Sequence, residues 1–389
     1  MSAASVPPAP SRLVSLDAFR GFTIAAMLLV NNPGDWSNLY RQLGHAEWNG
    51  WTFTDWIFPF FLFIVGVAMT ISLAQKSSDE TDKRGVMLSL WKRAAIIFLI
   101  GLTLNLIPAF NFETLRIPGV LQRIGLCVFF AAPIVLFFSK REQWAWILSL
   151  LGLYTVLMLF VPVPDLNGVV GMGVLEPGRD FGAFVDRIFL DGHLWAKSKV
   201  WDPEGIVSTL PAIVSLLLGA QVGYGLQSTL SKAEKTIWML LAGLAALLLG
   251  QILDAGLMPI NKSLWTVSYC VFMTGWALIV FAIFYWLIDA NDSPVLKAQA
   301  ARWLKPFTIF GMNALFIFAL SGLIAKMLGA IKFQAASGAE ISLKTVLYGP
   351  IKSLGMAPVN ASLLFAILFT LVLFGVAWWM WRRNWFIKV

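Results

Sequence analysis

Apolar runs of helical length recur along almost the whole chain, separated by connections that contain charges, Pro or Gly. A helix needs about 20 mostly apolar residues to cross the hydrocarbon core of a bilayer. We therefore predict an all-α fold, a polytopic membrane bundle of about ten transmembrane helices. The predicted spans are residues 16–34, 54–75, 90–109, 117–138, 143–161, 205–226, 235–253, 264–288, 304–328 and 360–382.

The remaining segments fit one membrane domain, predicted at 15–389, behind a Pro- and Ala-rich leader at 1–14. The first apolar run has no small-residue cleavage site at its end, so we interpret it as a retained helix. Residues 162–204 form a long outer loop that either builds a site or caps the bundle passively. Residues 329–359 are too broken to cross the membrane and predict a re-entrant or interfacial turn.

Composition supports a membrane protein, because 58% of the residues are hydrophobic, 13% are charged and the mean hydropathy is +0.76. Such a chain has too few polar residues to cover a water-soluble domain of this size. The net charge of +8 is spread over many connections, without the interleaved basic and aromatic patch of a nucleic-acid site. Anionic lipid or a phosphorylated small molecule is the better partner.

Lys and Arg also predict the orientation of the chain, with both termini in the cytoplasm. The outer connections carry Arg41, Arg116 and Lys262 near the helix ends, although the last outer region, with Lys326, Lys332, Lys344 and Lys352, runs against the rule. The inner connections and the tail carry Lys76, Lys83, Arg84, Lys92, Arg93, Lys140, Arg141, Lys232, Lys235, Lys297, Arg302, Lys305, Arg382, Arg383 and Lys388.

The two cysteines, Cys127 and Cys270, lie inside apolar spans. We expect them to pack as small hydrophobic side chains. They predict neither a disulfide nor a metal site.

One of the two histidines, His45, stands in the peptide GHAEWNGWTFTDWIFPFFLFIVG at 44–66, just before the second span. Beside a carboxylate, an imidazole can take a proton from an attacking group and return it later. It can equally be a passive anchor at the lipid interface. Asp55 has a structural interpretation too, because Thr52 to Asp55 resembles a capping box and a carboxylate there complements the helix dipole. The nearby Trp48, Trp51 and Trp56 fit an interfacial aromatic belt.

Polar residues inside the spans give a second signal. Arg123, next to Gln122, should face the bundle interior, because an arginine at that depth costs roughly 2.5 to 3.5 kcal/mol. Arg20 is ambiguous, since its i,i+3 spacing from Asp17 also suits a pair that anchors the helix end. The amides of Asn31, Asn32, Asn105, Asn261 and Asn313 either line a polar cavity or simply bond between helices. Two outer peptides, WDPEG and NKSLW, present Asp202, Glu204, Asn261 and Lys262, which suit sugar hydroxyls and amines but also turns.

Several of these peptides together resemble one enzyme family. They are RLVSLDAFRGFTIAAMLLVNN, GHAEWNGWTFTDWIFPFFLFIVG, LRIPGVLQRIG, WDPEGIVSTLPAIVSLLLGAQVG, PINKSLWTVSY and GMNALFIF. In this order, from about residue 12 onward, the chain resembles the heparan-alpha-glucosaminide N-acetyltransferase family, which has bacterial members. The resemblance implies a transmembrane acyltransferase that moves an acetyl group from cytoplasmic acetyl-CoA to the amino group of a glucosamine-type sugar on the outer side.

The resemblance also implies roles for individual residues. The family's catalytic histidine corresponds to His45, its asparagine to Asn31 or Asn32, and its helix-opening aspartate to Asp55. The spacing from the asparagine to the histidine is longer here than in the human enzyme, and the chain lacks the large luminal region of the animal enzymes. The natural sugar acceptor therefore stays open.

The implied chemistry fits the residues. His45 is expected to act as a general base or as an acetyl carrier, with an asparagine at the oxyanion and Asp55 stabilising the imidazolium. We expect acetyl-CoA to be the donor, no metal to take part, and the protein to be a homodimer in a bacterial inner membrane. The donor candidates are Arg123, Gln122, Arg20, Lys92 and Arg93, and the acceptor candidates are Trp48, Asn49, Glu204 and Asn261.

Two other functions remain open at this stage. A secondary transporter or flippase would use Arg123 and the polar amides as a substrate path, and would show paired broken helices, of which the sequence shows no convincing pair. An O-acyltransferase for envelope polysaccharide would use the same donor and a hydroxyl acceptor.

Overall fold

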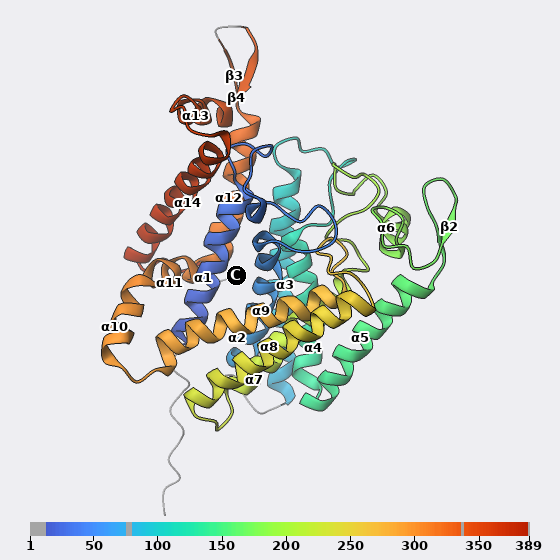
Figure 1. Ribbon diagram of the computed structural model, residues 1–389, viewed down its shortest axis with the longest axis vertical. Helices are drawn as coiled ribbons and strands as arrows, with labels where there is room; N and C mark the ends of the chain where they lie inside the picture. Colours follow the sequence, from blue (N-terminus) through green and yellow to red (C-terminus); the bar gives the residue numbers. More distant parts are fainter. Residues whose placement is uncertain (1–12, 75–79, 336–337, 388–389) are drawn as a thin grey trace, which may run out of the picture.

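The computed structural model describes residues 13–74, 80–335 and 338–387, and these residues form a bundle of helices (Figure 1). Within them, nine helices are long and apolar enough to cross a membrane, and one further pair of bent helices would make a tenth span. The helices of the nine spans are α1 (Val14–Asn31), α2 (Ile57–Ala74), α3 (Glu80–Leu106), α4 (Val120–Phe137), α5 (Lys140–Phe160), α7 (Thr209–Leu226), α8 (Lys232–Gly256), α9 (Val267–Tyr285) and α14 (Pro358–Arg382).

The shorter elements lie in the connections or form the bent pair. They are the 3-10 helices η1 (Arg41–Leu43) and η2 (Phe53–Trp56), the π-helical turn η3 (Trp286–Ala290), the helices α6 (Phe181–Leu190), α10 (Pro294–Trp303), α11 (Lys305–Met312), α12 (Ala314–Ala330) and α13 (Leu343–Lys352), and the strands β1 (Val163–Pro164), β2 (Val170–Gly171), β3 (Lys332–Gln334) and β4 (Glu340–Ser342). The strands pair as two antiparallel hairpins, β1 with β2 and β3 with β4.

The structure confirms the predicted all-α membrane bundle, and a helix or bent pair stands at each of the ten predicted spans. The ninth span differs from the prediction, because the segment expected as one helix at 304–328 is bent by 81° between α11 and α12. The bend falls at Asn313, whose backbone is not helical. Asparagine favours helix ends because its amide competes with the backbone for hydrogen bonds.

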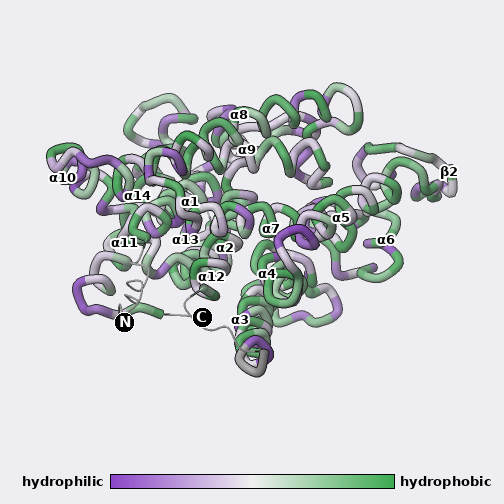
Figure 2. The backbone as a smooth tube through the Cα atoms, turned by 90° about the horizontal axis from the view of Figure 1, so that it is seen from below, coloured by the Kyte–Doolittle hydropathy of each residue, from purple (hydrophilic) through white to green (hydrophobic). Residues whose placement is uncertain are grey.

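The spans differ in how deeply they are buried. Helices α1, α2, α4 and α7 are largely enclosed, whereas α3, α5 and α8 have few buried residues and lie at the periphery. Figure 2 shows hydrophobic residues along the helices and hydrophilic residues gathered in the connections and at α10. This pattern is the one that lipid contact around a packed bundle requires.

Glycine allows two of the inner helix pairs to touch through their backbones. A Cβ atom on Gly21 of α1 would lie 1.6 Å from the Phe307 carbonyl oxygen of α11, and one on Gly66 of α2 would lie 1.9 Å from the Leu216 oxygen of α7. Such close approach through small residues is typical of membrane helices. It fixes α1 and α2, which carry the site peptide between them.

The remaining sequence predictions have mixed outcomes. Cys127 and Cys270 are buried free thiols, as predicted. The region predicted as a re-entrant or interfacial turn contains the β3–β4 hairpin and the ten-residue helix α13 (Figure 1). Residues 1–12 of the predicted leader lie outside the described residues. The division into a leader and one domain stays a prediction.

Candidate active site

His45 and Asp55 contact each other just before the N-terminal end of α2, after the connection formed by residues 32–52. The His45 Nδ1 atom lies 2.6 Å from the Asp55 Oδ1 atom. The Asp55 side chain is fully buried, whereas 49% of the His45 side chain is exposed. A buried carboxylate beside Nδ1 favours the tautomer that has its proton on Nδ1, which leaves Nε2 free to accept a proton.

The local fold of residues 44–56 explains why Asp55 is held so firmly. Its second oxygen, Oδ2, accepts hydrogen bonds from the backbone N–H of Thr52, the Thr52 hydroxyl and the backbone N–H of Ala46. The capping box predicted from the sequence is therefore present at η2. In addition, the Tyr269 hydroxyl of α9 donates to the Asp55 carbonyl oxygen at 2.6 Å. The structural and the chemical interpretation of Asp55 hold together, because each uses a different carboxylate oxygen.

The peptide that carries His45 is tied to two other connections, the loop after α5 and the segment between α8 and α9. The Trp48 indole N–H donates to the Leu175 carbonyl oxygen, and its ring packs edge-on against Trp201 at 5.2 Å. Asn49 accepts a hydrogen bond from the Asn261 side-chain amide at 3.1 Å. The long loop after α5 therefore packs against the peptide that carries His45. Three of the acceptor candidates, Trp48, Asn49 and Asn261, lie in one neighbourhood.

The tryptophans nearer to α2 form an internal aromatic cluster. Trp56 stacks on Trp276 of α9 with a centroid distance of 4.4 Å, and Trp51 packs against both rings and Phe272. These contacts give Trp51 and Trp56 a packing role inside the bundle, in place of the interfacial belt expected from the sequence.

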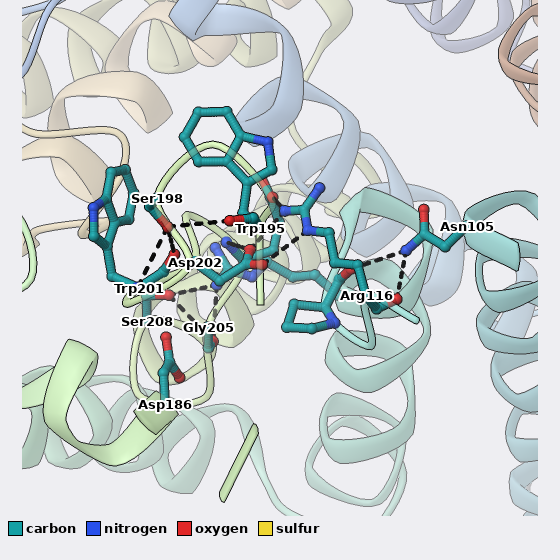
Figure 3. Close-up of polar contacts among 12 residues, drawn as sticks. Asn105, Arg116, Asp186, Trp195, Ser198, Trp201, Asp202, Gly205 and Ser208 are labelled. Carbon is teal, nitrogen blue, oxygen red and sulfur yellow. Dashed lines mark hydrogen bonds and ion pairs between the residues drawn. The ribbon is translucent and has the colours of Figure 1, made fainter. Parts of the chain in front are cut away.

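A network of charged side chains joins the connection before α4 to the long loop after α5 (Figure 3). Arg116 bonds to both carboxylate oxygens of Asp202, at 2.8 and 2.6 Å, and to Glu204 at 2.7 Å. Lys262 lies 3.5 Å from the other Glu204 oxygen. Asn105 of α3 supports the loop by donating to the carbonyl oxygens of Arg116 and Pro118.

Electrostatics in this network keep Glu204 and Arg116 charged. Burial alone would raise the pKa of Glu204, but the charges of Lys262 and Arg116 outweigh it and lower that pKa to about 2. Burial would likewise lower the pKa of Arg116, yet Asp202 and Glu204 raise it above its usual value. Glu204, predicted to bind the acceptor, is thus already engaged with two cations. Sequence reasoning missed Arg116, although two buried acids in WDPEG require a counter-charge.

Arg123 lies in the interior, as predicted. Its guanidinium donates to the Gly205 carbonyl oxygen and the Ser208 hydroxyl, and it lies 5.4 Å from the centroid of the Trp265 ring. Its Nε and Nη1 atoms have no hydrogen-bond partner among the described residues. Gln122 is also buried, with its side-chain amide close to Gly101 and Gly119. The structure thus places Arg123 beside Gly205 and Ser208, and Gln122 beside α3 and the residue before α4.

A second feature is a basic cavity of about 610 Å³ among α1, α2, α3, α4 and the α11–α12 bend. Arg20, Lys92 and Arg93 line it together, so the structure joins three of the predicted donor residues. Arg20 also makes the predicted i,i+3 pair with Asp17, at 3.1 Å. Phe61 and Val65 of α2 belong to the apolar part of the wall. Cationic side chains at one part of a cavity and apolar side chains at another suit a ligand with an anionic end and an apolar arm.

The cavity does not include His45. Along α2, Phe61 is its lining residue nearest to Asp55, six residues further along the chain. At 1.5 Å per residue, this separation is roughly 9 Å. The structure thus shows a basic cavity and a half-exposed imidazole, which are connected by α2.

The two candidate asparagines at the end of α1 differ in their surroundings. Asn32 is buried, and its side-chain amide donates to the Leu28 carbonyl oxygen of its own helix. Asn31, the last residue of α1, is exposed. Asn31 is therefore the asparagine whose amide remains available to a ligand.

The architecture and this pair of features define an all-α polytopic membrane protein with an imidazole–carboxylate pair beside the end of one span and a basic cavity along the same span. Residues 12–185 match the sequence model described as heparan-alpha-glucosaminide N-acetyltransferase, catalytic. Over these residues the chain is similar to the heparan-alpha-glucosaminide N-acetyltransferase family.

Two curated relatives carry that name. The chain is 29% identical over 362 residues to the heparan-alpha-glucosaminide N-acetyltransferase of Homo sapiens, across 79% of this chain and 52% of the relative. It is 28% identical over 357 residues to that of Mus musculus, across 79% of this chain and 53% of the relative. The chain thus spans about half the length of the curated relatives it matches.

Proposed function

We propose that this protein moves an acetyl group from cytoplasmic acetyl-CoA to the amino group of a glucosamine-type sugar on the outer side of a bacterial inner membrane. The observation that carries the proposal is the 2.6 Å contact between His45 Nδ1 and the buried Asp55 carboxylate. The names of the two relatives support the reaction class. Cytoplasmic termini and a homodimer remain predictions from the sequence.

The proposed reaction needs a base beside the acceptor. The sugar amine attacks the thioester carbon through its lone pair, the C–S bond of the tetrahedral intermediate breaks, and the thiolate of CoA leaves. The amine must lose a proton as the new C–N bond forms, and the free Nε2 atom of His45 accepts it. Asp55 stabilises the resulting imidazolium, and Asn31 supplies a hydrogen bond to the oxyanion.

A two-step route uses the same residues. Nε2 of His45 first attacks the thioester and expels CoA, which leaves an acetyl-imidazole that the amine then attacks. Incubation with labelled acetyl-CoA and no acceptor separates the two routes, because label bound to wild-type protein and absent from His45→Ala indicates the acyl carrier.

The donor is proposed to occupy the basic cavity. Arg20, Lys92 and Arg93 would bind the phosphates of the nucleotide end, while the pantetheine arm would lie along the α2 face that contains Phe61 and Val65. Because the cavity stops at Phe61, the acetyl end has to pass this ring to reach His45. We expect Phe61 to move when the donor binds.

The acceptor is proposed to lie over the peptide that carries His45. Asn49 is exposed and Trp48 is half-buried, so both can contact a sugar beside the imidazole. Asn261 orients Asn49 through their hydrogen bond. Glu204 does not contact the acceptor directly, because its carboxylate is engaged in holding Arg116 and Lys262 in place.

The test is acetyl transfer by purified protein in detergent, with radiolabelled acetyl-CoA and glucosamine. We expect His45→Ala to lower kcat by about 10³-fold or more. The matched control is His193→Ala, because among the described residues the His193 ring bonds to the Leu115 carbonyl oxygen and to no carboxylate. Equal rates for wild type and His45→Ala would reject the assignment. Acetylation of sugars that have hydroxyl groups but no amine would instead support the O-acyltransferase.

The transporter hypothesis predicts a different result. Among the described residues one pair of helices is bent, at Asn313, whereas a transporter built from repeats would show corresponding breaks in both halves. In proteoliposomes, a transporter would accumulate labelled glucosamine without acetyl-CoA, and His45→Ala would not change the rate.

A further inference from the structure

The segment after α14, residues 383–387, turns back against the bundle, and we call it the tail segment. Asn384 has a positive φ of 54°, and the backbone N–H of Trp385 bonds to the Met380 carbonyl oxygen at 2.9 Å. The Trp385 ring packs edge-on against Trp379, with a centroid distance of 5.0 Å. These contacts direct the segment toward the bend between α11 and α12.

Asn313, at that bend, holds the tail segment by both ends of its side-chain amide. Its Nδ2 atom donates to the Trp385 carbonyl oxygen at 3.0 Å, and its Oδ1 atom accepts from the Ile387 backbone N–H at 2.9 Å. In an extended segment, the C=O of one residue and the N–H of the residue two positions later point to the same side. The amide of Asn313 therefore bonds the segment as a neighbouring strand would.

This use of the amide differs from ordinary capping. Asn313 follows α11 and precedes α12, but its side chain makes no capping hydrogen bond to α12. Only 1% of the residue is exposed. A buried amide that loses its partners costs free energy, so the two bonds to the tail segment are expected to stay formed.

The bend and the tail segment both border the basic cavity. Ile387 lines it together with Gly311, Met312, Ala314 and Leu315, which surround Asn313 in sequence. Arg20, Lys92 and Arg93 line the same cavity. One side chain thus fixes a piece of the cavity wall that comes from the far end of the sequence.

We propose that Asn313 is a positioning residue of the donor site, which holds the tail segment in place so that Ile387 completes the wall against which the donor binds. The proposal rests on the proposed function, because it takes CoA as the ligand of this cavity. We call the two hydrogen bonds from Asn313 to the tail segment the clamp. Loss of the clamp frees the tail segment, opens the cavity wall and weakens the binding of CoA. The imidazole and its carboxylate are unaffected, so the effect falls on donor binding.

The first test measures CoA binding to the full-length protein in detergent by calorimetry. We expect Asn313→Ala to raise the Kd for CoA roughly five- to tenfold, the effect of losing two hydrogen bonds. Asn313→Asp keeps the shape and the acceptor for the Ile387 N–H, but it sets a carboxylate oxygen against the Trp385 carbonyl oxygen in a buried position. We therefore expect a rise in Kd at least as large.

The second test follows the wall directly, through maleimide labelling of Ile387→Cys. Cys127 and Cys270 are buried, so background labelling should be low. At a CoA concentration ten times Kd, we expect labelling at position 387 to slow about tenfold. Adding Asn313→Ala should speed labelling severalfold in the absence of CoA. Trp303→Cys on α10, where the tryptophan is 77% exposed and outside the cavity lining, should respond to neither change.

The two hypotheses fail in different ways. If wild type binds CoA but the Kd in Asn313→Ala and labelling at 387 are unchanged, the clamp is wrong and the proposed function stands. If wild type binds no CoA, the proposed donor site is wrong. Labelling without CoA still decides whether Asn313 holds the wall, because equal rates with Asn and Ala at position 313 reject the clamp.

Discussion

Asp55 divides its two carboxylate oxygens between His45 and the start of α2. Oδ1 lies 2.6 Å from the His45 Nδ1 atom, while Oδ2 accepts hydrogen bonds from Thr52 and Ala46. The backbone that forms the helix start therefore also fixes the position of the acid beside the imidazole. This arrangement allows an exposed imidazole to have a defined orientation, because its partner cannot rotate away without losing the cap.

Asp55→Asn should abolish most of the acetyltransferase activity. The amide cannot stabilise an imidazolium, and an N–H group in place of Oδ1 would favour the wrong tautomer of His45. We expect kcat to fall by about 10³- to 10⁴-fold. The measurement is the rate of acetylglucosamine formation at saturating acetyl-CoA.

The control for Asp55→Asn is Thr52→Val, which removes the hydroxyl contacts to Oδ2 and to the Gly44 carbonyl oxygen but leaves the contact between Asp55 and His45. We expect it to lower the free energy of unfolding by about 1 kcal/mol and to leave kcat of the folded protein nearly unchanged. If Thr52→Val lost as much activity as Asp55→Asn, the carboxylate would act mainly through the helix start.

Arg93→Gln and Lys92→Gln should weaken donor binding without affecting the chemical step. Both side chains line the basic cavity, so each replacement removes a charge that attracts the nucleotide phosphates. We expect the KM for acetyl-CoA to rise about three- to tenfold in each, with the difference shrinking at high salt.

Two comparisons make this prediction specific to the nucleotide. Acetyl-pantetheine lacks the nucleotide, so its KM should be the same in wild type and in both variants. Lys235→Gln removes a charge at the start of α8, outside the cavity lining, and should leave the KM for acetyl-CoA unchanged. A matching rise with acetyl-pantetheine would place the phosphates elsewhere.

Much of this architecture could be predicted from the sequence, because apolar length and charge position are local properties. The ten spans and the Thr52–Asp55 cap are of this kind. The interior location of Arg123 was predictable as well, since its depth in α4 already requires burial. Its partners were not, because depth along a helix does not indicate which connection folds over it, and Gly205 and Ser208 come from a distant loop.

Long-range contacts set the same limit at Asn313 and Arg116. The break at Asn313 depends on the tail segment, more than 70 residues later in the chain, whose backbone satisfies the amide. The ion pairs of Arg116 depend on Asp202 and Glu204. In each case the residue type indicated that a polar partner is needed, but only the tertiary structure shows which residue supplies it.

Phe61→Trp should slow acetyl transfer more than it weakens donor binding. Phe61 is the residue of α2 where the cavity ends before Asp55, so a larger ring there would obstruct the acetyl end. We expect kcat to fall at least about tenfold with a change of less than about threefold in the Kd for CoA. Phe61→Leu, which removes volume, should retain activity. Unchanged kcat in Phe61→Trp would mean that the acetyl group reaches His45 by another path.

Asp186→Asn should stabilise the protein at alkaline pH and have little effect at acidic pH. Burial raises the pKa of Asp186 to about 7, with Asp202 and Asp180 adding to the shift and the Ile206 N–H opposing it. A carboxyl whose folded-state pKa is raised binds a proton that the unfolded chain has already released. The free energy of unfolding therefore falls as pH rises from about 4 to about 7 and then levels off.

Asparagine keeps an acceptor for the Ile206 N–H and carries no charge, so we expect Asp186→Asn to raise the free energy of unfolding by on the order of 2 kcal/mol at pH 8 and by almost nothing at pH 4. Thermal unfolding in detergent at both pH values measures the difference. The control is Asp165→Asn, which should destabilise the protein at alkaline pH. Hydrogen bonds from the Asn167 and Val169 N–H groups lower the pKa of Asp165, so its charged form is favoured in the folded protein. An equal gain for Asp186→Asn at pH 4 and pH 8 would show that charge at Asp186 is not the cause.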